Sequence, residues 1–215
     1  MKIALFSDTH ALHGRVHIPD ADILIFAGDM THCRTARDVA DFNDFLGSLP
    51  HRHKIVVGGN HDHRLARDPE KAQSLLSAAV YLVDKAVVVS GITIYGAPWQ
   101  PTFNDRACDA FALPRGKALQ EKWDLIPPDV DILVTHSPPV GILDQDGPVA
   151  HGCAELSAAV AAIKPRYHVF GHIHSHHGLI KCGATTYINC NVQGENGLLR
   201  PALLLDYESG ELLEA

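Results

Sequence analysis

The sequence has no long apolar run, few cysteines and no CxxC pair. No apolar stretch approaches the roughly 18 residues that cross a bilayer, and residues 1–8 turn polar too early for a secretory signal. We therefore expect a cytoplasmic protein with no membrane partner. The cysteines number five, an odd count that argues against a disulfide framework, and their spacing argues against a cysteine-based zinc site.

Basic residues are also scarce. The chain has 18 Lys and Arg against 25 Asp and Glu, which gives a formal charge of −7. Non-specific binding to nucleic acid needs a basic surplus, so we do not expect it. Phosphate-bearing ligands stay compatible with this charge, because bound cations can reverse the local field. Histidine, in contrast, is abundant at 15 residues, and histidine is the commonest metal ligand in proteins.

The hydrophobic pattern predicts a single α/β domain over residues 1–215, because strand-like and helix-like segments alternate without a repeat or a linker. Thr35 and Asp38 resemble a capping box at the start of a helix. Further helices are predicted at 70–79, 116–122 and 153–163, and the second of these is short and lies inside a long loop at 99–123. Short runs rich in Val and Ile predict strands at 3–6, 23–27, 55–57, 87–89, 92–95, 132–134, 168–170, 185–188 and 202–205.

Polar side chains follow five of these predicted strands directly. Ligands bind at the carboxyl ends of strands in open α/β sheets, so we expect these side chains to converge. Carboxylates in contact repel one another, and bound cations offset that repulsion. Carboxylate, imidazole and amide ligands without thiolate suit Mn, Fe or Zn, and the number of ligands fits two ions better than one. The seven predicted ligands are Asp8, His10, Asp29, Asn60, His136, His172 and His174.

These motifs resemble the five sequence blocks of the calcineurin-like metallophosphoesterase superfamily over residues 3–189. The blocks are Asp8-x-His10, Gly28-Asp29, Gly59-Asn60-His61-Asp62, His136 and Gly171-His172-x-His174. The resemblance implies a four-layer α/β/β/α sandwich with a two-metal site at the carboxyl ends of the strands.

A narrower resemblance is to the metallophosphoesterase-domain-containing branch, whose members resemble phosphodiesterases of small nucleotides. Segments 95–101, 131–141 and 168–174 carry this second resemblance. The chain departs from the branch at Ser175-His176-His177, where Glu and then a Gly–aromatic pair are expected.

The resemblance also implies a role for each site residue. The first ion takes Asp8, His10, Asp29 and His174, and the second takes Asn60, His136 and His172 with Asp29 as the bridge. His61 faces the leaving group as a general acid, with Asp62 behind its imidazole. The implied reaction is hydrolysis of a small phosphodiester, such as a cyclic or linear nucleotide, by a hydroxide that bridges two divalent or trivalent ions. Trp99, Asn104 and His151 are further candidates for substrate contact, although core packing explains Trp99 better than stacking on a base does.

Three alternatives stay open at this point. The chain could be a protein phosphatase or a nuclease of the same superfamily, or a non-catalytic scaffold that binds nucleotide or metal. The intact ligand positions and His61 favour catalysis over a scaffold. A homo-oligomer is also compatible with the sequence.

Overall fold

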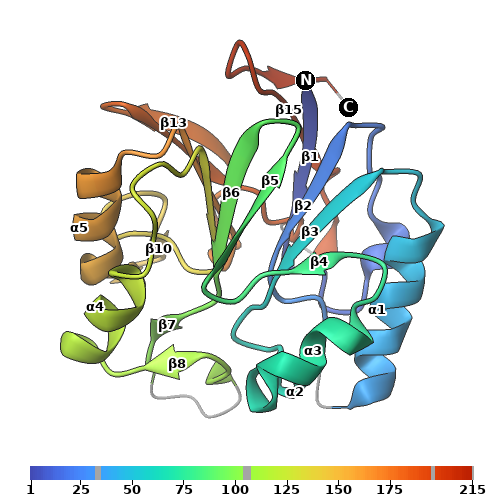
Figure 1. Cartoon of the computed structure of the whole chain (residues 1–215), viewed down its shortest axis with the longest axis horizontal. Helices are drawn as coiled ribbons and strands as arrows, with labels where there is room; N and C mark the ends of the chain where they lie inside the picture. The colour runs from blue at the N-terminus through green and yellow to red at the C-terminus, as the bar shows by residue number, and fades with distance from the viewer. Residues whose placement is uncertain (32–34, 104–107, 195–196, 215) are drawn as a thin grey trace.

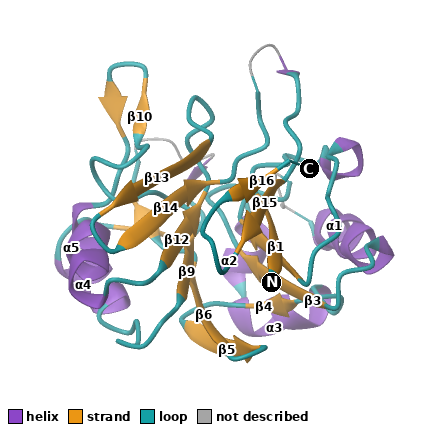
Figure 2. Cartoon of the chain, turned by 90° about the horizontal axis from the view of Figure 1, so that it is seen from above, coloured by secondary structure: helices purple, strands orange, loops and turns teal. Residues whose placement is uncertain are grey.

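Two six-stranded sheets pack face to face between two layers of helices (Figure 1). The computed structural model describes residues 1–31, 35–103, 108–194 and 197–214. Figure 2 shows α1 and α3 outside one sheet and α4 and α5 outside the other. The predicted α/β/β/α sandwich is therefore confirmed.

The first sheet has a parallel centre and an antiparallel edge. Strands β1 to β4 run parallel, β15 pairs antiparallel with β1, and β16 pairs antiparallel with β15. Its order is β16 (Leu212–Leu213), β15 (Leu203–Asp206), β1 (Lys2–Phe6), β2 (Ile23–Ala27), β3 (His53–Val57) and β4 (Val80–Tyr81).

The second sheet has four parallel strands flanked by two antiparallel edge strands. β14, β12, β9 and β6 run parallel, while β13 and β5 pair antiparallel at the two edges. Its order is β13 (Gly178–Cys182), β14 (Thr185–Asn189), β12 (Tyr167–Phe170), β9 (Ile132–Thr135), β6 (Ile92–Ala97) and β5 (Lys85–Val89).

Side-chain alternation along the central strands builds three cores. In β1, Ile3 and Leu5 enter the core between the sheets, whereas Ala4 and Phe6 enter the core beneath α1 (Ala36–Ser48). Successive side chains of a strand point to opposite faces, so a strand in the middle layers must be apolar throughout, as β2 is. The third core lies between the second sheet, α4 (Lys117–Trp123) and α5 (Ala154–Ile163).

The predicted helices are present, with one difference in length. Thr35 and Asp38 form the predicted capping box of α1. Asp68 caps α3 (Pro69–Leu75), which ends four residues before the predicted limit. The reason lies in Gln73, whose amide donates to the carbonyl oxygens of Leu76 and Ala79 and so stabilises the turn into β4.

Smaller elements lie near the carboxyl ends of the central strands. The predicted loop at 99–123 contains α4 and a short parallel pair, β7 (Gln100–Pro101) and β8 (Ala112–Leu113). β10 (Gln145–Asp146) and β11 (Val149–Ala150) form an antiparallel hairpin, and the remaining elements are α2 (His63–Arg67) and a 3-10 turn at His13–Arg15. Within the described ranges, no helix has the length and apolar character needed to cross a membrane.

Candidate metal centre

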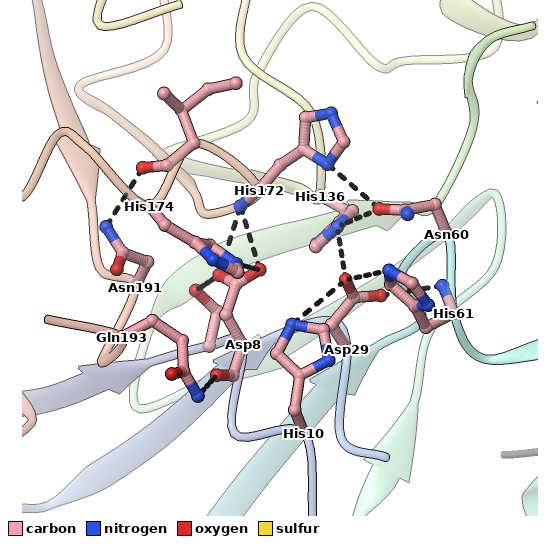
Figure 3. Close-up of polar contacts among 12 residues, drawn as sticks. Asp8, His10, Asp29, Asn60, His61, His136, His172, His174, Asn191 and Gln193 are labelled. Atoms are coloured by element: carbon pink, nitrogen blue, oxygen red, sulfur yellow. Dashed lines mark hydrogen bonds and ion pairs between the residues drawn. The ribbon is translucent and has the colours of Figure 1, made fainter. Parts of the chain in front are cut away.

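Five loops from both sheets meet at the carboxyl ends of their strands. The loops after β1, β2 and β3 carry Asp8, Asp29 and Asn60, and the loops after β9 and β12 of the other sheet carry His136 and His172. Figure 3 shows all seven predicted ligand residues facing one another in this cluster. The structure therefore brings together the residues that the sequence pattern singled out.

Four of the seven residues adopt a left-handed backbone conformation. The φ angles are 57° for Asp8, 42° for His10, 61° for Asp29 and 68° for His172. Residues other than glycine rarely take positive φ, although Asp and His tolerate it better than most. Backbone strain of this kind concentrates at functional sites, where the surrounding structure holds it in place.

Two glycines allow the loops to approach closely. A Cβ atom on Gly59 would lie 2.3 Å from Asp29 Oδ1 and 2.5 Å from the Asp29 backbone nitrogen. A Cβ atom on Gly171 would lie 2.2 Å from Asp8 Oδ2. No side chain tolerates such contacts, so the positions of both carboxylates depend on a bare backbone in the neighbouring loop.

One half of the cluster surrounds Asp8. His174 Nε2 lies 3.4 Å from Asp8 Oδ1, and the rings of His10 and His174 are 5.3 Å apart. The Asp8 carboxylate also accepts hydrogen bonds from the backbone nitrogen of His172 and from the hydroxyl of Ser7. These contacts fix the carboxylate with one oxygen close to an imidazole.

The other half surrounds Asp29 and Asn60. Asp29 Oδ2 lies 3.3 Å from His136 Nε2 and 3.8 Å from His10 Nε2, so this oxygen joins the two halves. Asn60 Oδ1 lies 2.8 Å from His136 Nε2 and 2.9 Å from His172 Nδ1. One carboxylate and one amide oxygen thus converge with imidazole nitrogens from both sheets.

The electrostatics of the cluster are dominated by buried charge. Burial raises the pKa of Asp8, but the hydrogen bond from His174 and the charge of His136 outweigh it and hold this pKa below its usual value. The pKa of Asp29 is likewise lowered, because His136 and His10 outweigh burial. Burial lowers the pKa of His136, yet Asp29 raises it to about 10 overall, whereas burial lowers the pKa of His172 to about 3.

The donor set fits divalent metal ions. Three sets of side chains, Asp8–His10–His174, His10–Asp29–His61 and Asp8–Asp29–His136, each bring one ligand atom per residue within 4.8 Å of the others. Asp8 is fully buried and Asp29 is 2% exposed, and the cationic partners of both among the described residues are imidazoles. Two buried carboxylates need compensating positive charge, and bound cations supply it.

His61 stands beside the cluster. Its Nε2 atom lies 4.0 Å from Asp29 Oδ2 and 3.5 Å from Cys108 Sγ, and its backbone nitrogen donates to Asp29 Oδ1 over 2.9 Å. The imidazole is part-buried and faces the cavity described below. From this position the His61 imidazole can donate a proton to a group bound next to the carboxylate cluster.

The Asp62 carboxylate bonds to backbone amides of two loops. Its Oδ2 atom accepts hydrogen bonds from the backbone nitrogens of Gly59 at 2.8 Å and Asp29 at 3.0 Å, while Oδ1 has no hydrogen-bond partner in the described structure. Burial and the charge of Asp29 raise the pKa of Asp62 to about 7. Asp62 therefore ties the loop after β2 to the loop after β3.

A cavity of about 260 Å³ opens beside the cluster. Phe103 stacks on His172 with ring centroids 5.5 Å apart, and its ring meets His151 edge-on at 5.6 Å. His151 thus lines the cavity, and its contact with substrate stays a prediction. Phe103 gives no sequence signal beyond its place in the long loop. The lining consists of Asp29, Asn60, His61, Phe103, Cys108, Asp146, His151, His172, Ile173 and His174.

Trp99 lies outside this lining. Its indole nitrogen donates to Asp84 Oδ1 over 2.6 Å, and Lys122 Nζ lies 4.0 Å from the ring centre. Phe111 packs edge-on against the indole. These contacts match the packing alternative for Trp99. The other candidate for substrate contact, Asn104, falls outside the described residues.

The segment that departs from the branch pattern, Ser175-His176-His177, forms hydrogen bonds to neighbouring segments. The Ser175 hydroxyl donates to the Gln145 carbonyl oxygen over 3.0 Å, and His177 Nδ1 lies 2.7 Å from the carbonyl oxygen of Asn191. The Asn191 amide in turn donates to the carbonyl oxygens of Ile173 and His176. These bonds fix the loop that carries His172 and His174, and they join it to the β10–β11 hairpin.

Comparisons with known proteins agree with the geometry. The sequence model of the calcineurin-like phosphoesterase family matches residues 1–176. Human metallophosphoesterase domain-containing protein 1 is 43% identical over 212 residues, with 86% of this chain and 64% of that protein covered. A UPF0046 protein of Caenorhabditis elegans is 41% identical over 215 residues, covering 88% of this chain and 74% of its own length. The chain thus spans about two thirds of the length of these relatives.

Solved structures support the fold. One crystal structure superposes with a TM-score of 0.74 at 16% identity and covers 99% of this chain and 97% of its own. The structure of an archaeal phosphodiesterase gives a TM-score of 0.52 at 14% identity and covers 100% of this chain and 99% of its own. At these identities the likeness concerns the fold alone.

Proposed function

The chain belongs to the calcineurin-like phosphoesterase family, and from this premise we propose that it is a metal-dependent hydrolase of small phosphodiesters. The observation that carries the proposal is the convergence of two buried carboxylates, one amide and four imidazoles at the edge of both sheets.

Two ions fit the ligand set. The first would take Asp8, His10, Asp29 and His174, and the second would take Asn60, His136 and His172 together with Asp29. The central position of Asp29 Oδ2, between His10 and His136, supports its role as the bridge. Oxygen and imidazole ligands of this kind suit Mn, Fe or Zn.

The chemistry divides between the ions and the chain. When bound, paired metal ions activate a water molecule for in-line attack and neutralise the phosphoryl oxygens. His61 is the general acid, and its Nε2 atom delivers a proton to the departing alkoxide. Asp62 positions this step indirectly, because its bonds to Gly59 and Asp29 hold together the loops that carry His61 and the bridging carboxylate.

The size and charge of the cavity favour a small substrate. At about 260 Å³ the cavity is slightly below the usual range for small-molecule sites, which begins at roughly 300 Å³. No Lys or Arg is among its described lining residues. A nuclease would need a longer, basic surface for its polymer, so this alternative is less well supported. A protein phosphatase is disfavoured mainly by the resemblance to the metallophosphoesterase-domain-containing branch.

The test combines a metal measurement with a hydrolysis assay. The purified protein should bind two ions by elemental analysis and hydrolyse bis-p-nitrophenyl phosphate with added Mn²⁺, and a chelator should abolish the reaction. Asp29→Ala should lower the metal content below two ions and eliminate turnover. Full metal content in this variant would contradict the bridging role, and a metal-loaded wild-type protein without activity on any phosphate ester would favour the scaffold.

A further inference from the structure

The β10–β11 hairpin is anchored beside the cavity at both ends. Before β10, the buried carboxylate of Asp144 accepts a hydrogen bond from the backbone nitrogen of Gly141 over 2.9 Å. The Asp144 carbonyl oxygen then accepts one from the backbone nitrogen of His151, which closes the base of the hairpin. Ser175 ties the first strand to the loop of His174. The hairpin, which stands out from the two sheets in Figure 2, is therefore held in a defined place relative to the metal cluster.

This hairpin contributes one unpaired carboxylate to the cavity. Asp146 is exposed and lines the cavity, and no hydrogen bond or ion pair engages its side chain in the described structure. The other lining carboxylate, Asp29, is buried among imidazoles. The described residues that line the cavity include no Lys or Arg. Two divalent ions would carry more positive charge than Asp8 and Asp29 carry negative charge, and among the described lining residues Asp146 is the carboxylate that lies outside the metal cluster.

We propose that Asp146 is a specificity-determining residue that selects monoanionic phosphodiesters against dianionic phosphomonoesters. The inference rests on the proposed phosphoesterase function and adds the residue that sets the substrate charge. Phosphate monoesters lose their second proton near pH 6, so at pH 8 a monoester carries two negative charges and a diester carries one. Asp146 repels each negative charge of the substrate, so the repulsive free energy is about twice as large for the monoester as for the diester.

This doubling gives the proposal a quantitative form. For an assumed separation of about 5 Å in water, Coulomb repulsion amounts to a factor of about 4 in kcat/KM per unit charge. Asp146→Asn should therefore raise kcat/KM by about 4-fold for a diester and by about 16-fold for a monoester. The ratio of monoester to diester activity then rises about 4-fold, and Asp146→Lys should raise it further.

The experiment compares two substrates with the same leaving group. kcat/KM for bis-p-nitrophenyl phosphate and p-nitrophenyl phosphate is measured at pH 8 with saturating Mn²⁺, for wild type, Asp146→Asn and Asp146→Lys. Asp129→Asn is the matched control, because Asp129 is an exposed carboxylate before the amino end of β9, whereas the metal cluster lies at the carboxyl ends of the strands. Each assay is repeated at low and at roughly 0.5 M salt, where the short Debye length should shrink the effect of the substitution.

The outcomes separate this inference from the proposed function. A wild-type protein that hydrolyses neither ester would count against the proposed function, and the inference would fall with it. Wild-type hydrolysis with an unchanged substrate ratio in both Asp146 variants would overturn only the role of Asp146. A loss of diester activity in Asp146→Asn would also overturn it, since that result means that the carboxylate binds the substrate. A salt-sensitive rise in the ratio, absent in Asp129→Asn, supports the proposal.

Discussion

Replacing Gly59 by alanine tests whether the metal cluster depends on close contact between two loops. The added Cβ atom would lie 2.3 Å from Asp29 Oδ1 and 2.5 Å from the Asp29 backbone nitrogen. The backbone nitrogen cannot turn aside as a flexible side chain can, so the loop after β2 must shift. Overpacking of this kind costs about 1–3 kcal/mol of unfolding free energy. Because Asp29 joins both halves of the cluster, we also expect Mn²⁺ affinity to fall by about 10–100-fold, the loss typical of disturbed support around a metal site.

The matched control is the same substitution in α1. Gly47 is helical and exposed, and a Cβ atom there would meet only Ala78 Cβ at 3.9 Å. Gly47→Ala should therefore stabilise the protein by about 0.5–1 kcal/mol and leave metal binding unchanged. Urea unfolding in chelator measures stability, and calorimetric titration with Mn²⁺ measures binding. If Gly59→Ala matched wild type in both measurements, the dependence of Asp29 on a bare neighbouring backbone would be refuted.

Two further predictions concern histidines with different tasks. His61→Ala should keep the wild-type metal content and lower kcat by about 10²–10⁴-fold for alkyl diesters, with a smaller loss for p-nitrophenyl esters, which need little proton assistance; equal losses would contradict the general-acid role. Burial lowers the pKa of His168 to about 3, below the usual 6.5, so protons bind its unfolded form preferentially. The unfolding free energy should therefore fall as the pH drops below 6.5, by up to about 3 kcal/mol near pH 4.5. Urea unfolding at each pH should show a weaker dependence in His168→Phe, and an unchanged dependence would argue against a neutral buried His168.

The sequence predicts those parts of the molecule that local rules determine. Continuous apolar runs such as β2 identify strands buried on both faces, and the Thr35–Asp38 pair marks the start of α1. Polar residues at five strand ends point to one cluster because parallel strands share an edge. The seven candidate ligands could therefore be placed together before any tertiary contact was known.

The opposite wall of the cavity could not be predicted in this way. Phe103 reaches it from a loop and Asp146 from the two-residue strand β10, and neither segment has a periodicity that indicates which way a side chain points. The role of Asp62 also escapes the sequence, because its partners Gly59 and Asp29 are backbone amides, one of them 33 positions away. Contacts made by the backbone between distant loops leave no trace in residue types.

The cluster is built from both sheets, so metal binding depends on the correct packing of the whole sandwich. Asp8, Asp29 and Asn60 follow strands of one sheet, and His136 and His172 follow strands of the other. An ion held by both groups is a cross-link that exists only while the sheets are correctly packed. Such binding favours the folded state by mass action, by about 2.7 kcal/mol when the free ion is at 100 times its dissociation constant. Under the proposed function, the concentration of free metal ion therefore affects the stability of the fold as well as the rate of hydrolysis.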